Sequence, residues 1–245
     1  MKHRARRPYK ENYNYRRGGR CKDYKCEDTG KCKQARKAIC NAYSYGDCID
    51  KKCLSDLGLD PCKKLIIVTC MDASIDPYDI FDLCPGQANI IRNAGGNITE
   101  DVIRSISISQ VKLGTNQILL LKHYGCVMNS INDEEFACFL KKNSCNDPLF
   151  KVGSFQDAFV QAEYDVRTIR SCPYIPCKAC IGALVLIDVD VKIKRGKKCY
   201  GIGDVVPVCV EDCCPTDEWK RLCGKKEQCE GLYIAEYDYS YGCCS

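Results

Sequence analysis

The chain is 245 residues long, contains 23 cysteines and carries a formal net charge of +5. This length is sufficient to bury a hydrophobic core, and the modest charge by itself points to no particular class of partner. No apolar run approaches the ~20 residues that a membrane-spanning helix needs, so no membrane span is expected. The basic first ten residues lack the apolar stretch of a signal peptide behind them.

Residues 1–20 form a basic tail in which eight Lys or Arg residues are interleaved with tyrosines and a single acid, Glu11. Basic residues mixed with aromatic residues and glycine bind phosphates and stack on bases, so nucleic acid is one candidate partner. An acidic protein surface is the other anionic partner that the composition fits, and a solvated tail is the plain alternative.

Residues 21–62 form a cysteine-rich lobe. Four residues separate Cys21 from Cys26 and Cys48 from Cys53, unlike the two-residue gaps of zinc knuckles, so disulfides are expected here. Additional zinc sites in a reducing cytoplasm are the alternative. Disulfides would require an oxidising compartment or a particle with its own thiol oxidase, for which a virus particle is the analogy.

Residues 63–196 have the pattern of an α/β domain. Short apolar runs predict strands at 65–70, 88–92, 117–122 and 182–194, and intervening periodic segments predict helices at 76–83, 99–113, 132–142 and 155–171. Thr99 and Gly114 are typical of the start and the end of the second helix, whose many apolar residues fit a mostly buried crossover. The order of elements predicts a mostly parallel central sheet flanked by helices.

Residues 197–245 form a second cysteine-rich extension. Its stretch 232–241 alternates well enough to add a strand to a sheet edge, either its own or a neighbour's. Before this extension, Cys177 and Cys180 have the spacing of a redox motif, but Pro173 and Pro176 just ahead of them indicate a loop. A structural bridge or a second metal site therefore fits this pair better than redox catalysis.

Three residues in the core domain have the chemistry of a metal site. Cys70 ends the first predicted strand, and His123 and Cys126 follow the third. Parallel strands place ligands at their carboxyl ends, so we expect these side chains to converge. Two sulfurs and an imidazole are a standard zinc set that leaves a fourth position open.

The order of motifs around these residues resembles the β-carbonic anhydrases. Cys70-Met-Asp72 is followed by Arg92-Asn93-Ala94-Gly95-Gly96, then by the crossover helix and by His123-x-x-Cys126, as in the shorter branch of that family. The resemblance covers about residues 62–196. It implies a zinc enzyme that hydrates CO2 to bicarbonate, a homodimer, and a loop from Arg92 to Gly96 that forms a wall of the site.

The sequence departs from that family beside the first cysteine. In the family, the Asp equivalent to Asp72 pairs with an Arg two residues further on, which keeps the carboxylate away from the zinc. Here that position is Ser74, and a short neutral hydroxyl cannot form the bidentate clamp of a guanidinium. Asp72 is therefore a candidate fourth zinc ligand, which would close the site. Capping the next helix or pairing with Arg92 are its alternatives.

A second departure follows the last ligand, where Val127 replaces the usual glycine. A β-branched residue is disfavoured at positive φ and would crowd a small substrate. Together, Ser74 and Val127 favour a degenerate member: zinc kept for stability, catalysis lost, and the scaffold used as a disulfide-stapled component of an assembly such as a virion. The alternatives are an active carbonic anhydrase in which Asp72 serves catalysis, and nucleic-acid association through the tail.

Overall fold

The computed structural model describes residues 57–176, 179–195 and 198–210, together with Ala38 and Ala42. The chain divides into two units, residues 1–59 and 60–245, and the fold described below is that of the second. The predicted tail at 1–20, the disulfides of the lobe and the strand at 232–241 lie outside the described residues. Among the helices that are described, none combines the length and apolar character needed to cross a bilayer.

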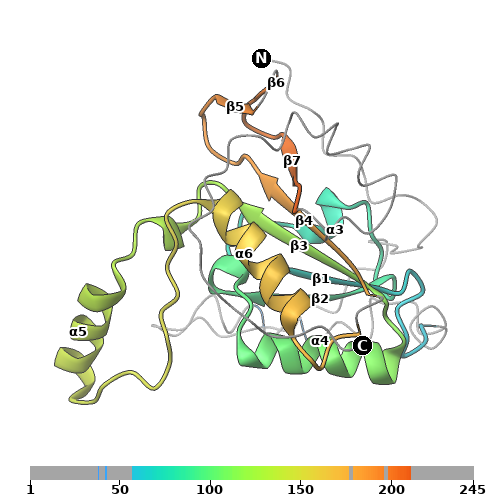
Figure 1. The fold of residues 1–245 in the computed structure, drawn as a ribbon, viewed down its shortest axis with the longest axis horizontal. Coiled ribbons are helices and arrows are strands. Elements are labelled where there is room, and N and C mark those ends of the chain that lie inside the picture. The colour runs from blue at the N-terminus through green and yellow to red at the C-terminus, as the bar shows by residue number, and fades with distance from the viewer. Residues whose placement is uncertain (1–37, 39–41, 43–56, 177–178, 196–197, 211–245) are drawn as a thin grey trace, which may run out of the picture. The chain divides into compact units, whose positions relative to one another are not determined.

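A five-stranded sheet in the order β2-β1-β3-β4-β7 forms the centre of this unit (Figure 1). Its strands are β1 (Leu65–Cys70), β2 (Ala88–Asn93), β3 (Gln117–His123), β4 (Cys180–Leu186) and β7 (Val205–Val208). The first four pair in parallel, and β7 runs antiparallel to β4. The predicted mostly parallel α/β sheet is thereby confirmed.

The helices begin and end where polar caps and glycine dictate. They are α3 (Pro77–Ile80), α4 (Glu100–Leu113), α5 (Asp133–Ser144) and α6 (Ala158–Ser171), with short 3-10 turns η1 (Ala94–Gly96) and η2 (Val127–Asn129). Thr99 caps α4 by accepting from the amide of Val102, and Gly114 ends it in the left-handed conformation. Both signals were read correctly from the sequence.

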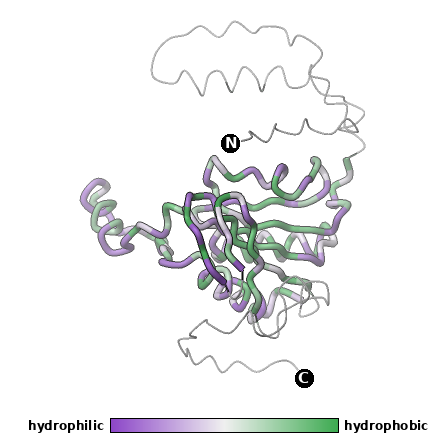
Figure 2. The backbone as a smooth tube through the Cα atoms, turned by 90° about the horizontal axis from the view of Figure 1, so that it is seen from above, coloured by the Kyte–Doolittle hydropathy of each residue, from purple (hydrophilic) through white to green (hydrophobic). Residues whose placement is uncertain are grey.

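The core lies between the sheet and the helices α4 and α6. Strand residues such as Ile67, Leu120 and Val185 are fully buried, and α6 contributes Ala158, Ile169 and their neighbours. Seen from above, the strands run through the body as largely hydrophobic segments (Figure 2). Helix α4 was expected to be mostly buried, but its Ile108 and Val111 are exposed. Only part of this helix therefore faces the core.

Three elements differ from the prediction. The helix expected at 76–83 is the shorter α3, because Asp82 adopts a positive φ soon after the helix ends. The strand expected at 182–194 stops at Leu186; residues further along form β5 (Ile193–Arg195), which pairs with β6 (Lys198–Tyr200) in a separate ribbon. Finally, β7 comes from the segment assigned to the C-terminal extension, yet its Val206 and Val208 belong to the core.

Candidate metal centre

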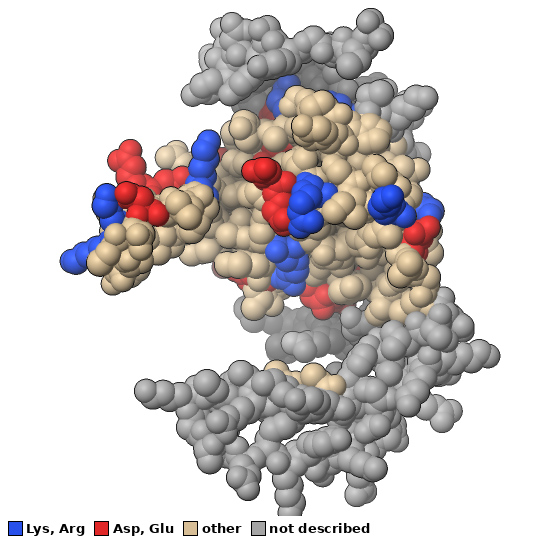
Figure 3. All heavy atoms as spheres, turned by 90° about the horizontal axis from the view of Figure 1, so that it is seen from below, with Lys and Arg blue, Asp and Glu red and all other residues tan. Residues whose placement is uncertain are grey.

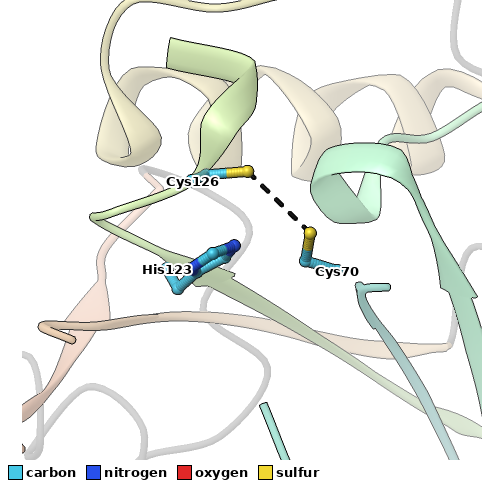
Figure 4. Close-up of side chains that lie close together, drawn as sticks. All are labelled: Cys70, His123 and Cys126. Carbon is cyan, nitrogen blue, oxygen red and sulfur yellow. Dashed lines mark hydrogen bonds between the residues drawn. The ribbon is translucent and has the colours of Figure 1, made fainter. Parts of the chain in front are cut away.

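The fold brings Cys70, His123 and Cys126 together at the carboxyl edge of the sheet. Cys70 ends β1 and His123 ends the adjacent β3, while Cys126 lies just before η2. One ligand atom from each lies within 4.8 Å of the other two, and all three residues are buried. In Figure 4 the two sulfurs face one another and the imidazole is turned toward them. The predicted convergence is therefore present.

The two sulfurs lie within hydrogen-bonding distance of each other. Their Sγ atoms are 3.8 Å apart, so one thiol can donate a hydrogen bond to the other sulfur as a thiolate. This contact with Cys126 lowers the pKa of Cys70 to about 4, whereas the same contact, reinforced by burial, raises the pKa of Cys126. The pair thus holds a negative charge readily, as a site for a divalent cation requires.

His123 is oriented by Asp188, a residue that was not among the predicted site residues. The Nδ1 atom of His123 lies 2.6 Å from Oδ2 of Asp188, so the ring donates to the carboxylate there. Burial opposes protonation of His123, but the nearby Cys70 thiolate and the Asp188 carboxylate outweigh it and raise the pKa of His123. The signal available in the sequence was an Asp placed just after a buried strand.

The other imidazole nitrogen indicates what the site holds. Nε2 of His123 is buried and has no hydrogen-bond partner among the described residues. An unpaired polar atom of this kind is costly unless another group binds it. A zinc ion placed against two sulfurs and this nitrogen would satisfy it, so the residues present fit the metal.

Gly125 makes room for the carboxylate that orients His123. Its amide donates to Oδ1 of Asp188 at 2.7 Å. A Cβ atom at Gly125 would lie 2.5 Å from Val189 Cγ1 and 3.0 Å from Asp188 Oδ1, which is closer than side chains tolerate. The missing side chain is thus part of the support of the metal centre.

Asp72 lies beside the three ligands without joining their group. Its Oδ1 accepts hydrogen bonds from the amide of Ser74 at 2.8 Å and from the Ser74 hydroxyl at 2.6 Å. The hydroxyl contact, ahead of the amide, lowers the pKa of Asp72 and keeps it ionised. Arg92 donates to the backbone carbonyls of Cys70 and Asp72, rather than to the carboxylate.

The predicted site wall lies against the first ligand. Arg92 and Asn93 end β2, and Ala94, Gly95 and Gly96 form η1. A Cβ atom on Gly96 would lie 2.8 Å from the backbone carbon of Thr69, so only glycine permits this approach. Val127 does not have the strained backbone that the sequence reading assumed. Val127 lies in η2 and is not one of the residues with a positive φ. It is 57% exposed.

Comparisons with known proteins agree with this geometry. The protein-family model for carbonic anhydrase matches residues 65–142. The chain is 38% identical to β-carbonic anhydrase 1 of Mycobacterium tuberculosis over 119 residues, which are 49% of this chain and 73% of that protein. The chain belongs to the β-carbonic anhydrase family.

Two further proteins similar to this chain differ in the substrate that their names indicate. A carbonic anhydrase structure from Streptococcus mutans aligns with a TM-score of 0.60 and 28% identity, covering 74% of this chain and all of the other. A carbon disulfide hydrolase of Acidianus is 32% identical over 109 residues, covering 41% of this chain and 53% of that protein. These relatives therefore bear the names of two different activities, carbonic anhydrase and carbon disulfide hydrolase.

The cysteines outside the metal centre were expected to form disulfides. Among the described residues, nine cysteines including Cys70 and Cys126 are free, and Cys209 is disulfide-bonded. Of the redox-spaced pair, Cys180 begins β4 as a free thiol and Cys177 lies outside the described residues. The disulfide-stapled character of the two extensions stays a prediction.

Proposed function

We propose that this β-carbonic anhydrase family member holds zinc through Cys70, His123 and Cys126 and catalyses the reversible hydration of CO2. The observation that carries the proposal is the position of Asp72, whose carboxylate is bound by Ser74 and not grouped with the three ligands. Three protein ligands leave a fourth zinc position open, which is characteristic of catalytic sites. When bound, zinc would supply the Lewis acidity that activates water.

Ser74 supplies part of what the family's arginine provides. Its amide and hydroxyl both donate to one oxygen of Asp72, which favours the ionised carboxylate in its present orientation. The hold is weaker than a bidentate guanidinium clamp, because both donors are neutral. Asp72 is thereby placed to accept a proton from a substrate water at the open side of the site.

The support of His123 serves the same purpose from the other side. Asp188 accepts a hydrogen bond from the Nδ1–H group of His123, which leaves the Nε2 lone pair directed toward the two sulfurs. Because Asp188 also accepts from the amide of Gly125, its own orientation is fixed by the segment between His123 and Cys126. The ligand set is consequently held before any metal binds, which lowers the cost of assembling the site.

Stopped-flow hydration of CO2, with zinc content measured on the same samples, tests the proposal. We expect the zinc-loaded protein to turn over CO2, Asp72→Asn to keep zinc but lose most activity, and Ser74→Ala to lose part of it. Ser171→Ala, at the exposed end of α6, is the matched control. A zinc-loaded protein without turnover would refute the enzyme and leave the structural, degenerate role.

Ser74→Arg separates an open site from a closed one. If Asp72 were a zinc ligand, a guanidinium at position 74 would withdraw it and create activity. In an open site the same change leaves the metal ligands as they are and alters turnover only modestly. Measuring carbon disulfide hydrolysis beside CO2 hydration assigns the substrate, since preference for CS2 would contradict the substrate proposed here.

The expected partner proteins and nucleic acid are proposals separate from the metal site. A homodimer or larger assembly stays a prediction, as does an acidic protein or nucleic acid bound by the tail at 1–20.

A further inference from the structure

A lysine lies buried directly behind the metal centre. Lys122 precedes the ligand His123 on β3, and only 1% of the residue is exposed. Its Nζ atom donates to the carbonyl oxygens of Gly95 at 3.0 Å and Gly96 at 2.9 Å, and to Oδ1 of Asn97 at 3.1 Å. The ammonium group thus directs its donors at the loop that forms the wall of the site.

That loop packs against one candidate ligand, Cys70, and against the turn that follows a second, Cys126. Gly96 packs against the backbone of Thr69 and Cys70, where an added Cβ would lie 2.9 Å from the Cys70 nitrogen. On its other side Gly95 packs against Met128, two residues beyond Cys126, at 3.0 Å from an added Cβ. A displacement of this turn would therefore be felt at both sulfurs.

The charge of Lys122 is balanced within the fold. Oδ2 of Asp165, a buried residue of α6, lies 2.5 Å from Nζ, and Gln161 donates to the other carboxylate oxygen at 2.9 Å. A buried ion pair is a poor way to stabilise a fold, because apolar residues of similar volume often do as well or better. Packing alone therefore gives no reason for a charge at this position.

We propose that Lys122 is a positioning residue of the metal centre, fixing the Gly95–Gly96 turn against Cys70 while Asp165 neutralises its charge. This inference rests on the proposed zinc site but not on the hydration of CO2. Lys122 acts through the turn, since its donors reach carbonyl oxygens of the loop and not the ligand atoms.

Metal binding provides the test, with zinc affinity measured by chelator competition and the thiolate-to-cobalt absorption recorded after Co2+ substitution. We expect Lys122→Met to weaken zinc binding roughly 10–100-fold, the range for groups that orient metal ligands, and to alter the cobalt spectrum. Asp165→Asn leaves the buried ammonium without its counter-charge and should lower thermal stability, but the carbonyl contacts remain, so the cobalt spectrum of the folded protein should change little. Lys112→Met, on the exposed side of α4, is the control.

The double variant Lys122→Met/Asp165→Leu separates positioning from folding. Removing both charges leaves an apolar interior, so we expect this variant to be as thermally stable as the wild type. The turn still lacks the donors of Lys122, so zinc affinity should stay low. Wild-type affinity and spectrum in this folded double variant would overturn the inference. A wild-type protein that binds neither zinc nor cobalt would instead refute the proposed metal centre, and this inference with it.

Discussion

Helices α5 and α6 start alike and end up in opposite environments. Both follow β3, and each begins after a side chain that accepts two backbone amides, Asn132 for α5 and Asp157 for α6. Yet α6 buries six residues against the sheet, whereas α5 has no buried residue at all. A cap determines where a helix begins, and only packing determines what it contributes to the fold.

The surface of the two helices shows the same contrast. Figure 3 shows acidic and basic side chains gathered on the arm that carries α5, beside a body whose visible face is mostly uncharged. Phe139 of α5 is 61% exposed, while Ile169 of α6 is fully buried. The candidate metal centre belongs to the same packed region as α6, because α6 contacts β3 and its Asp165 pairs with Lys122.

The largest expected effect is on the free energy of unfolding, when one apolar side chain is truncated in each helix. Ile169→Ala should lower the free energy of unfolding by about 2–5 kcal/mol, because it leaves a cavity in the core. Phe139→Ala should change it by no more than about 0.5 kcal/mol, as for other exposed positions. Urea denaturation of both variants measures this, and comparable losses would mean that a partner of α5 had been overlooked.

The next largest effect is expected on zinc affinity, from a substitution at the closely packed Gly125. Gly125→Ala places a methyl group against Val189 and Asp188, so the carboxylate is pushed away from His123. We expect zinc affinity to fall roughly 10–100-fold, as when an outer partner of a ligand is lost. Gly201→Ala is the control, since its Cβ would have no neighbour nearer than 3.7 Å. Equal affinities in a chelator competition would contradict the role given to Asp188.

Removing the two caps compares the helices directly. Asp157→Ala should lower the global free energy of unfolding by about 1 kcal/mol, because α6 unfolds together with the sheet. Asn132→Ala should loosen α5 alone, so its amides exchange faster while the global midpoint hardly moves. Hydrogen exchange followed residue by residue distinguishes the two. A global loss from Asn132→Ala would show that α5 is coupled to the core.

The smallest effect lies where α5 joins the body. Asp133 accepts from the amides of Gly153 and Ser154, and the Ser154 side chain is the main cause of its lowered pKa. Ser154→Ala should therefore raise that pKa toward its ordinary value. A depressed carboxyl pKa stabilises the folded state above the unfolded pKa, and this contribution disappears as pH falls through the folded value. An NMR titration of Asp133 that is the same in both proteins would contradict this.

Short-range patterns explain which parts of the fold could be predicted. The apolar runs of β1 and β3, the cap at Thr99 and the glycine at Gly114 each act within a few residues, so they could be read directly. The strand expected through residue 194 failed at Leu186, because Asp188 turns to His123 instead of continuing the sheet. The place of Asp188 after a buried strand is a signal in the sequence, but it does not identify His123, 65 positions away, as the partner.

By itself, the sequence determined most of the elements, the family resemblance and the three candidate ligands, because strand polarity places Cys70, His123 and Cys126 at one edge. Tertiary structure decided how those ligands are supported. Asp188 meets His123 across 65 positions of the chain, and Lys122, a charge inside an apolar run, finds Asp165 only when α6 packs on β3. It also placed Asp72 against Ser74, since hydrogen-bond geometry depends on backbone conformation that residue identity alone does not specify.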